Sequence, residues 1–305
     1  MHLGLAVPQY GAFARPDAIR RVARAAEEMG FHSLWVGDRI LTPVRPRDRY
    51  PSRDGGMPEQ YRTFLDPLTV LTVAAEATER VRLGTSTLNA LWYPPVVMAR
   101  TLTTLDLVSG GRLDVGIGLG WARDEYQAAG VPWEGRGRRL EEWLDVVEAV
   151  WAGNPVAHEG PHYAVPESHI APKPVQRPHP PLLLAGFSPR SLARVGRRAD
   201  GWLPVAMPLP ALARAWRAIQ EAAEAAGRDP ARLRRPLRIN ATLVSEPTDG
   251  GRPGHGTVAQ LADYVLAAAA EGVSEVFVDL QQTTTEVDEM LEHAAALAAR
   301  VGVSA

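Results

Sequence analysis

Eight short apolar segments recur along the chain, and each is followed by a longer stretch with helical spacing of apolar residues. Several of the short segments are continuously apolar, which is the pattern of parallel strands covered on both faces. In the first helical stretch, Ile19, Val22 and Ala26 fall on one side, and Gly30 follows as a stop. The predicted strands are residues 3–7, 33–36, 81–84, 113–117, 182–185, 201–205, 237–244 and 275–278.

This alternation predicts an α/β fold of the (β/α)8 TIM-barrel type, with the active site at the carboxyl ends of the strands. The alternative is an open doubly wound sheet, which is disfavoured because no Gly-x-Gly-x-x-Gly turn follows the first strand. A chain of 305 residues that is 46% hydrophobic and 22% charged is long enough to bury a large core. We expect one domain over residues 1–305, since barrels use this length as a single domain.

Composition excludes several classes of function. The chain has no cysteine, which excludes disulfides, zinc–thiolate sites, iron–sulfur clusters and thiol nucleophiles. A net charge of −2 does not suit nucleic acid as a main partner, because phosphate binding needs a basic surface. The N-terminal segment has no basic leader, and the apolar stretch at 261–270 is too short to span a bilayer. We therefore expect a cytoplasmic protein with no membrane partner.

Two insertions interrupt the alternation of strands and helices. Residues 39–64 mix arginines, aspartates, glycines and prolines after the second strand, and residues 154–181 are rich in proline and histidine. Long segments without regular structure inside a compact domain are usually functional loops or disordered. The first insertion follows the carboxyl end of a strand, where barrels have their active site, which suggests a lid or substrate loop. The alternative is a plain solvated loop.

Four ordered blocks of residues together resemble the bacterial-luciferase-like family of flavin- and deazaflavin-dependent oxidoreductases. Within that family the chain looks most like the subgroup that uses the deazaflavin coenzyme F420. The blocks extend over roughly the first two thirds of the chain, where a strand–helix barrel is expected. They are GFHSLWVGD at 30–38, TERVRLGTS at 78–86 with LDLVSGGRL at 105–113, GIGLGW at 116–121, and PKPVQ at 172–176 with LAGFS at 184–188 and ADGW at 199–202.

The resemblance implies a ring-edge or substrate-contacting acid at Asp38, which ends the second strand; a turn aspartate is the structural alternative. Relatives that oxidise sugar phosphates or alcohols usually carry a catalytic histidine at the next position, where this chain has Arg39. Arginine cannot act as a general base near neutral pH, so histidine-based alcohol oxidation is in doubt. Those relatives also carry an acid at the position of Trp121, which here makes the pocket apolar.

The resemblance further implies contacts to the cofactor from the third and fourth strands. Ser86–Thr87 corresponds to a non-prolyl cis peptide that presses on the back of the ring, and Asn89 donates to the ring edge or the substrate. Gly118 and Gly120 allow the backbone to approach a planar ligand closely, although turns also use glycine. The other cofactor contacts implied on this side are Trp121 and Asp124.

The segment after the fifth strand is predicted to bind the phosphate of the cofactor. Gly186, Phe187 and Ser188 precede a helix, after Ala185, and a helix N-terminus presents free N–H groups and partial positive charge to an anion. Arg190 adds a charged contact or faces solvent. The structural alternative is a simple serine N-cap followed by a first-turn proline.

Three other groups of residues have plainer interpretations. His158, His162 and His169 lie close in sequence, but a solvated loop fits their pattern better than a metal site. The arginine-rich stretch at 228–238 is interpreted as a solvated connection rather than an anion-binding patch. Glu125 is expected to cap a helix or to form a structural ion pair.

These observations predict an oxidoreductase that transfers a hydride between F420 and a small organic substrate. Asp38, Tyr10 or solvent supplies protons, and Tyr10 is expected to line the pocket at the end of the first strand. The first alternative is an FMN-dependent monooxygenase that uses molecular oxygen, and the second is a non-catalytic flavin-binding protein. A metal-dependent barrel hydrolase is disfavoured because no carboxylate–histidine ligand set follows the strands.

The expected assembly is a homodimer, which is implied by the resemblance. Met98, Leu102 and Leu105 recur at helical spacing, which places them in the core or at such an interface. The identity of the substrate is not readable from the sequence, because it depends on the 39–64 loop and on the shape of the pocket.

Overall fold

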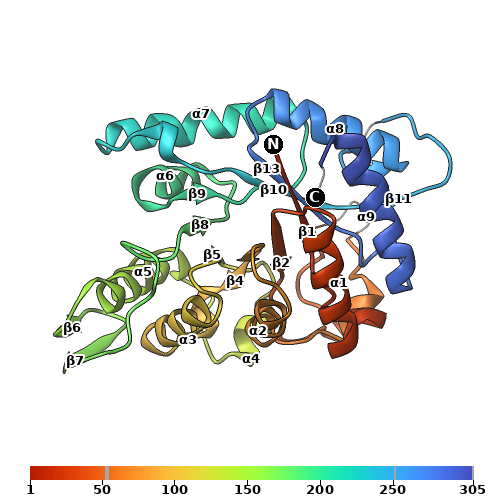
Figure 1. Ribbon diagram of the computed structural model, residues 1–305. Coiled ribbons are helices and arrows are strands. Elements are labelled where there is room, and N and C mark those ends of the chain that lie inside the picture. Colours follow the sequence, from red (N-terminus) through yellow and green to blue (C-terminus); the bar gives the residue numbers. More distant parts are fainter. Residues whose placement is uncertain (52–54, 251, 304–305) are drawn as a thin grey trace.

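Eight parallel strands close into a barrel in the computed structural model, which describes residues 1–51, 55–250 and 252–303 (Figure 1). Residues 52–54 of the predicted 39–64 loop thus lie outside the described residues. Neighbouring strands pair in the order β10–β13–β1–β2–β3–β5–β8–β9, and bridges from Gly201 to Arg234 and from Val205 to Arg238 join the two ends. The barrel strands are β1 (His2–Ala6), β2 (Ser33–Val36), β3 (Arg82–Thr85), β5 (Leu113–Gly118), β8 (Leu182–Leu184), β9 (Gly201–Trp202), β10 (Pro236–Asn240) and β13 (Glu275–Asp279).

Each predicted strand segment thus overlaps a barrel strand, and the predicted α/β TIM-barrel fold is confirmed. The helices lie outside the strands (Figure 1). The Asp66 side chain caps one of them by accepting a hydrogen bond from Thr69 N at 2.8 Å, and Pro67 stands in its first turn. The helices are α1 (Pro16–Glu28), α2 (Pro67–Ala77), α3 (Pro95–Val108), α4 (Arg123–Ala128), α5 (Arg136–Ala152), α6 (Pro189–Arg198), α7 (Leu209–Ala225), α8 (Val258–Ala270) and α9 (Val287–Val301).

Within the described ranges, no helix is both long enough and apolar enough to cross a membrane. The core contains three buried side chains of α3, namely Met98, Leu102 and Leu105. Of the two predicted positions, core or dimer interface, the first is therefore observed. Short 3-10 helices complete the helical structure: η1 (Gly11–Phe13), η2 (Glu59–Arg62), η3 (Ala90–Trp92) and η4 (Pro230–Arg232).

Short strands outside the main barrel correct one prediction. The 154–181 insertion is not without regular structure, because β6 (Val156–Glu159) and β7 (Ala164–Ser168) form an antiparallel hairpin. The buried Glu142 carboxylate accepts hydrogen bonds from the backbone of His162 and Tyr163 and lies 3.4 Å from His158 Nε2, which fixes the turn of the hairpin. The other short strands are β4 (Leu88–Asn89), which pairs with β5, and the pair β11 (Thr242–Leu243) and β12 (His255–Gly256).

The interior of the barrel is filled by two stacked aromatic side chains. The rings of Trp35 and Phe277 lie 4.3 Å apart at 12°, and both are buried together with Leu183 and Leu203. Gly84 leaves the space that the indole occupies, because a Cβ atom at Gly84 would stand 2.3 Å from Trp35 Cε3. The middle of the barrel is therefore a packed core rather than a channel.

A buried charge network closes the barrel at the amino ends of its strands. Asp114 accepts hydrogen bonds from Arg82 at 2.6 and 2.9 Å and from Arg234 at 2.7 and 2.9 Å, and Arg234 also reaches Glu275 at 3.2 Å. Burial alone would raise the pKa of the Asp114 carboxyl, but the two guanidinium groups hold it below its ordinary value. The prediction that 228–238 is a solvated connection is therefore wrong for Arg234 and also for Arg238, which lies inside the barrel.

Gly84→Ala is expected to lower the free energy of unfolding by about 1–3 kcal/mol, because the added methyl group overpacks the interior against the indole of Trp35. Urea denaturation measures the change. Adding Trp35→Leu removes the ring, so the double variant should lose less stability than the sum of the two single variants. Additive losses would contradict the assignment of these two positions to one packed layer.

Candidate active site

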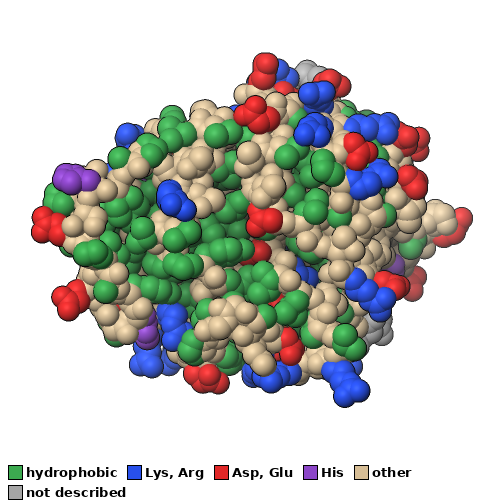
Figure 2. Space-filling view, turned by 90° about the horizontal axis from the view of Figure 1, so that it is seen from below, with side chains coloured by type: hydrophobic (Ala, Val, Ile, Leu, Met, Phe, Trp, Pro, Cys, Tyr) green, Lys and Arg blue, Asp and Glu red, His purple; other side chains and the backbone are tan. Residues whose placement is uncertain are grey.

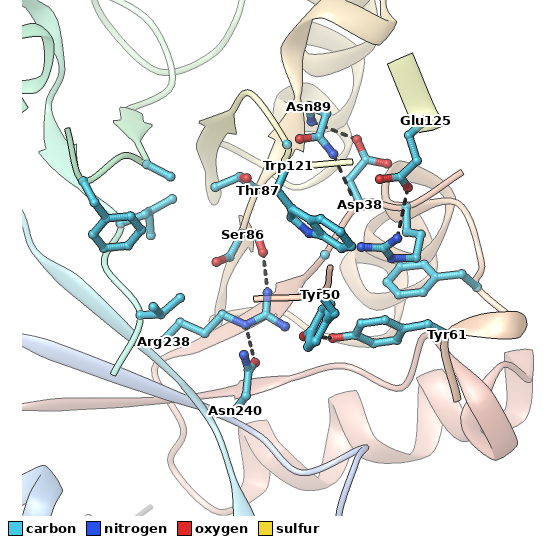
Figure 3. Close-up of a pocket in the computed structure, with 18 residues that line it drawn as sticks. Asp38, Tyr50, Tyr61, Ser86, Thr87, Asn89, Trp121, Glu125, Arg238 and Asn240 are labelled. Carbon is cyan, nitrogen blue, oxygen red and sulfur yellow. Dashed lines mark hydrogen bonds and ion pairs between the residues drawn. The ribbon is translucent and has the colours of Figure 1, made fainter. Parts of the chain in front are cut away.

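A pocket opens at the carboxyl ends of the barrel strands (Figure 3). Leu203, which belongs to the buried layer of Trp35 and Phe277, also lines the pocket and forms part of its floor. Eight of the predicted site residues line it: Asp38, Ser86, Thr87, Asn89, Gly120, Trp121, Ala185 and Phe187.

Asp38 is a partly buried acid that stands two residues after the end of β2. Its carboxylate accepts hydrogen bonds from Asn89 N at 2.9 Å (Figure 3) and from the Tyr93 hydroxyl at 3.2 Å. Burial raises the pKa of the Asp38 carboxyl to about 7, and the two hydrogen bonds limit that rise. The group can therefore both give and take a proton near neutral pH.

The wall after β3 carries the cis peptide that the resemblance implied. The bond between Ser86 and Thr87 is cis and non-prolyl, and Ser86 N donates to Val36 O at 2.7 Å. A Cβ atom at Gly118 would stand 2.3 Å from Thr87 Oγ1. Gly118 thus supports the wall from behind and is not among the residues that line the pocket; its contact with a ligand stays a prediction.

Arg238, from β10, is a pocket residue that the sequence analysis missed. Its guanidinium donates to Ser86 O and, at 2.8 Å, to Asn240 Oδ1 (Figure 3). It also donates to Asp279 Oδ2 at 2.7 Å. Burial by itself lowers the pKa of Arg238, but Asp279 outweighs it and keeps the group charged. The side chains of Arg238 and Asn240 add polar groups to the lining of the pocket.

Tyr10 lies behind the pocket wall, so the expectation that it lines the pocket is wrong. Its side chain is buried, its ring stacks on Phe64 at 5.2 Å, and its hydroxyl donates to Asp279 at 3.0 Å. The pKa of Tyr10 is raised well above its ordinary value by burial and by the neighbouring Asp279. Its geometry suits the support of the Asp279–Arg238 pair better than proton delivery.

The 39–64 insertion supplies much of one pocket wall, in agreement with the substrate-loop interpretation. The Arg39 guanidinium lies 3.4 Å from Glu125 Oε1 and 5.1 and 5.2 Å from the ring centroids of Tyr61 and Trp121. Tyr50 packs edge-on against Trp121 at 5.4 Å (Figure 3). Glu125 forms the expected ion pair, but it also lines the pocket, which the sequence analysis did not anticipate.

The remaining predicted cofactor residues do not line the pocket. Asp124 instead accepts a hydrogen bond from Arg47 N at 2.9 Å. Ser188 is the N-cap of α6 and accepts from Ser191 N at 3.2 Å, while Arg190 is exposed. Gly186 lies between the lining residues Ala185 and Phe187, and a Cβ atom there would stand 2.5 Å from Ser191 Cβ. Phosphate binding at this helix end stays a prediction.

The pocket suits a flat, mainly apolar ring with one polar edge. Ala185, Phe187, Leu203 and Val205 provide apolar groups, and Arg238, which pairs with Val205 in the barrel, provides hydrogen-bonding groups beside them together with Asn240. This combination of an apolar slot and a few directed polar groups is what a flavin or deazaflavin ring requires.

Comparison with known proteins places the chain among oxidoreductases. Residues 2–249 match the family described as luciferase-like monooxygenase. The phthiodiolone/phenolphthiodiolone dimycocerosates ketoreductase of Mycobacterium tuberculosis is 29% identical over 275 residues, which cover 83% of this chain and 71% of that protein.

Two solved structures share the fold over nearly their whole length. Monooxygenase RslO1 from Streptomyces bottropensis superposes with a TM-score of 0.83 at 22% identity and covers 99% of this chain and 98% of its own. The coenzyme F420-dependent tetrahydromethanopterin reductase from Methanopyrus kandleri superposes with a TM-score of 0.76 at 19% identity and covers 96% and 97%. Such low identities show the barrel fold and leave the choice of cofactor open.

Asp38→Asn is expected to change the pH dependence of stability. The pKa of Asp38 in the folded protein, about 7, lies above its ordinary value of 3.8, so its contribution to stability is complete below the ordinary value and is lost as the pH rises through 7. Asparagine does not ionise. The melting temperature of the variant relative to the wild type should therefore be higher at about pH 8 than at about pH 5.

Thermal melting by circular dichroism across this pH range measures the effect. Asp17→Asn is the control, because the Asp17 side chain is 76% exposed in its ion pair with Arg15. A difference between Asp38→Asn and the wild type that stays constant with pH would show that Asp38 ionises at its ordinary pKa.

Proposed function

Because the chain belongs to the luciferase-like monooxygenase family, we propose that it is an oxidoreductase that transfers a hydride between coenzyme F420 and a small organic substrate. The observation that supports this function best is the buried carboxyl of Asp38 in a pocket with an apolar side. Hydride transfer to a carbonyl or an activated double bond consumes one proton, and an acid with a pKa of about 7 can supply it.

In this proposal some pocket residues bind the cofactor ring, and Asp38 donates the proton. A reduced deazaflavin, when bound, supplies a hydride from its C5. Arg238 and Asn240 would hold the polar edge of the ring, and Ala185 and Leu203 its apolar face. Asp38 would stand ready as the proton donor, because its hydrogen bonds from Asn89 and Tyr93 fix the carboxyl.

The relatives favour reduction over alcohol oxidation, while the side chain next to Asp38 adds no base besides Asp38 itself. Alcohol oxidation requires a base to take the hydroxyl proton, and an arginine side chain does not serve as one. Arg39 is moreover paired with Glu125 inside the pocket. The ketoreductase among the relatives acts in the same direction according to its name.

Fluorescence titration of the purified protein with F420 and, separately, with FMN tests the proposal. We expect tight binding of F420 and weak binding of FMN. The reverse order would move the protein to the FMN-dependent monooxygenase alternative, and binding without turnover under any reductant would favour a non-catalytic flavin-binding protein.

Gly186→Ala should weaken cofactor binding about tenfold if the loop before α6 holds the phosphate, because the new Cβ would stand 2.5 Å from Ser191 Cβ and displace the loop. Gly153→Ala is the matched control, since a Cβ at Gly153 meets nothing within 4 Å. Equal affinities of the two variants would argue against phosphate binding at this helix end.

We also propose that the protein forms a homodimer through α2 and α3. Figure 2 shows hydrophobic side chains gathered on the face that carries these helices. A groove between them is lined by apolar side chains and threonines, and Val97 and Val108 are 47% and 44% exposed. Exposed apolar patches of this kind usually mark an interface, and a two-fold dimer pairs the same patch on both copies.

Val97→Glu should convert the dimer to a monomer, because it places a charge in the centre of the apolar groove. Light scattering coupled to gel filtration measures the mass. Leu266→Glu is the control, since Leu266 is also exposed (46%) but lies on α8, outside the groove. A wild-type protein that elutes as a monomer would refute the proposed interface.

A further inference from the structure

The Arg39 guanidinium is buried in the pocket wall with part of its hydrogen-bonding capacity unused. The side chains of Arg39 and its partner Glu125 are only 7% and 2% exposed. In the described part of the chain, the polar contacts of Arg39 are both made by Nη1, to Glu125 Oε1 at 3.4 Å and to Leu41 O at 3.5 Å. An Nε or Nη2 atom without a hydrogen bond would be an unsatisfied buried donor if the protein enclosed it fully. Neither atom is of that kind, so both remain accessible from the pocket that Arg39 lines.

Two aromatic rings fix the plane of this guanidinium. Its central carbon lies 5.1 Å from the centroid of the Tyr61 ring and 5.2 Å from that of Trp121. The Tyr50 ring stands edge-on to both, and the Tyr50 and Tyr61 hydroxyls are 3.2 Å apart (Figure 3). Donors held in this way need little reorganisation to meet an oxygen atom that gains charge during a reaction.

The charges of the pocket argue against an anionic substrate. The charge of Glu125 compensates that of Arg39. Arg238 carries the other guanidinium among the described lining residues, and Asp279 compensates its charge at 2.7 Å. Asp38 adds a further carboxyl. A phosphate dianion entering this wall would meet Glu125 and Asp38 without an excess of positive charge, whereas an uncharged carbonyl group would not be repelled.

We propose that Arg39 binds the carbonyl oxygen of a flat, uncharged, conjugated ketone or aldehyde that stacks on Trp121 and Tyr50, which makes Arg39 a catalytic residue of this chain. This inference rests on the proposed function, because it assigns the substrate class of the same pocket. Arginine suits this role since it donates hydrogen bonds, keeps its proton and presents planar, fixed N–H groups.

The reduction of the carbonyl to an alcohol uses residues that line the pocket. The carbonyl carbon accepts a hydride, the π electron pair moves to the oxygen, and the Arg39 N–H groups stabilise the alkoxide as its charge develops. Asp38 gives its proton to that oxygen, which completes the alcohol, and water restores the proton on Asp38. The two electrons that reduce the carbonyl come from the reduced deazaflavin.

Binding of 4-nitrophenol in the presence of oxidised F420 tests the inference without turnover. Its phenolate mimics the alkoxide, and its absorption reports its ionisation directly. With the wild type, the pKa of bound 4-nitrophenol should be lower than with Arg39→Met by about 1 to 3 pH units, because the guanidinium favours the anion. Arg39→Lys should retain part of the effect.

Arg136→Met is the matched control, because Arg136 also stacks on a tryptophan, Trp133 at 3.8 Å, but lies outside the pocket. It should behave as the wild type does. Arg39→Met leaves Glu125 buried without its partner, so Arg39→Met/Glu125→Gln is made in parallel to remove both charges. Thermal melting and F420 titration confirm that each variant is folded and still binds cofactor.

The substrate class is tested by displacement of 4-nitrophenol from the wild type. Acetophenone should displace it, and ribose 5-phosphate should not. If F420 binds but the pKa of bound 4-nitrophenol is the same with and without Arg39, or if ribose 5-phosphate alone displaces the probe, the inference is wrong while the proposed function stands. If F420 does not bind at all, the proposed function itself fails.

Discussion

The stacked pair of Trp35 and Phe277 is the contact on which the architecture of this chain depends. A closed sheet of eight parallel strands must fill its own interior, and here two large rings do so at a separation of 4.3 Å. Because Gly84 has no side chain, it leaves the space that the indole of Trp35 occupies. Because the rings block the barrel at mid-height, Leu203 becomes the floor of a pocket, and the carboxyl ends of the strands become its walls.

Carboxylates around the Trp35–Phe277 pair are mostly paired with arginines. Most acids inside the barrel or its mouth have a guanidinium partner: Asp114 has Arg82 and Arg234, Asp279 has Arg238, and Glu125 has Arg39. Pairing holds the pKa of Asp114 below its ordinary value despite complete burial. Asp38 receives only a backbone N–H and a tyrosine hydroxyl among its described hydrogen bonds, so burial prevails and raises its pKa to about 7. The difference in partners separates a structural carboxylate from an acid that can exchange protons.

Local patterns in the sequence were sufficient to predict the barrel, because each strand is a short apolar run that needs no knowledge of its neighbours. Asp38, Ser86 and Trp121 were predicted from the family resemblance, and all three line the pocket beyond the ends of such runs. Arg238 was missed because a charged residue within an arginine-rich stretch looks solvated, and only the inward alternation of β10 reveals that it faces Asp279. Tyr10 was misplaced because the fold of the 39–64 insertion, which brings Phe64 over it, leaves no periodic pattern in the sequence.

Tyr93 joins the pocket to the outer surface of the barrel. Its hydroxyl donates to Asp38 at 3.2 Å, and the same residue lines the groove between α2 and α3. A second copy seated on that groove would exclude water from the outer side of Tyr93. Less water around the tyrosine strengthens the effect of burial on Asp38, since a lower local dielectric disfavours the ionised carboxylate. In the proposed dimer, assembly and the acidity of Asp38 would thus be linked through one hydrogen bond, and the partner copy would contribute to the chemistry of the pocket as well as to stability.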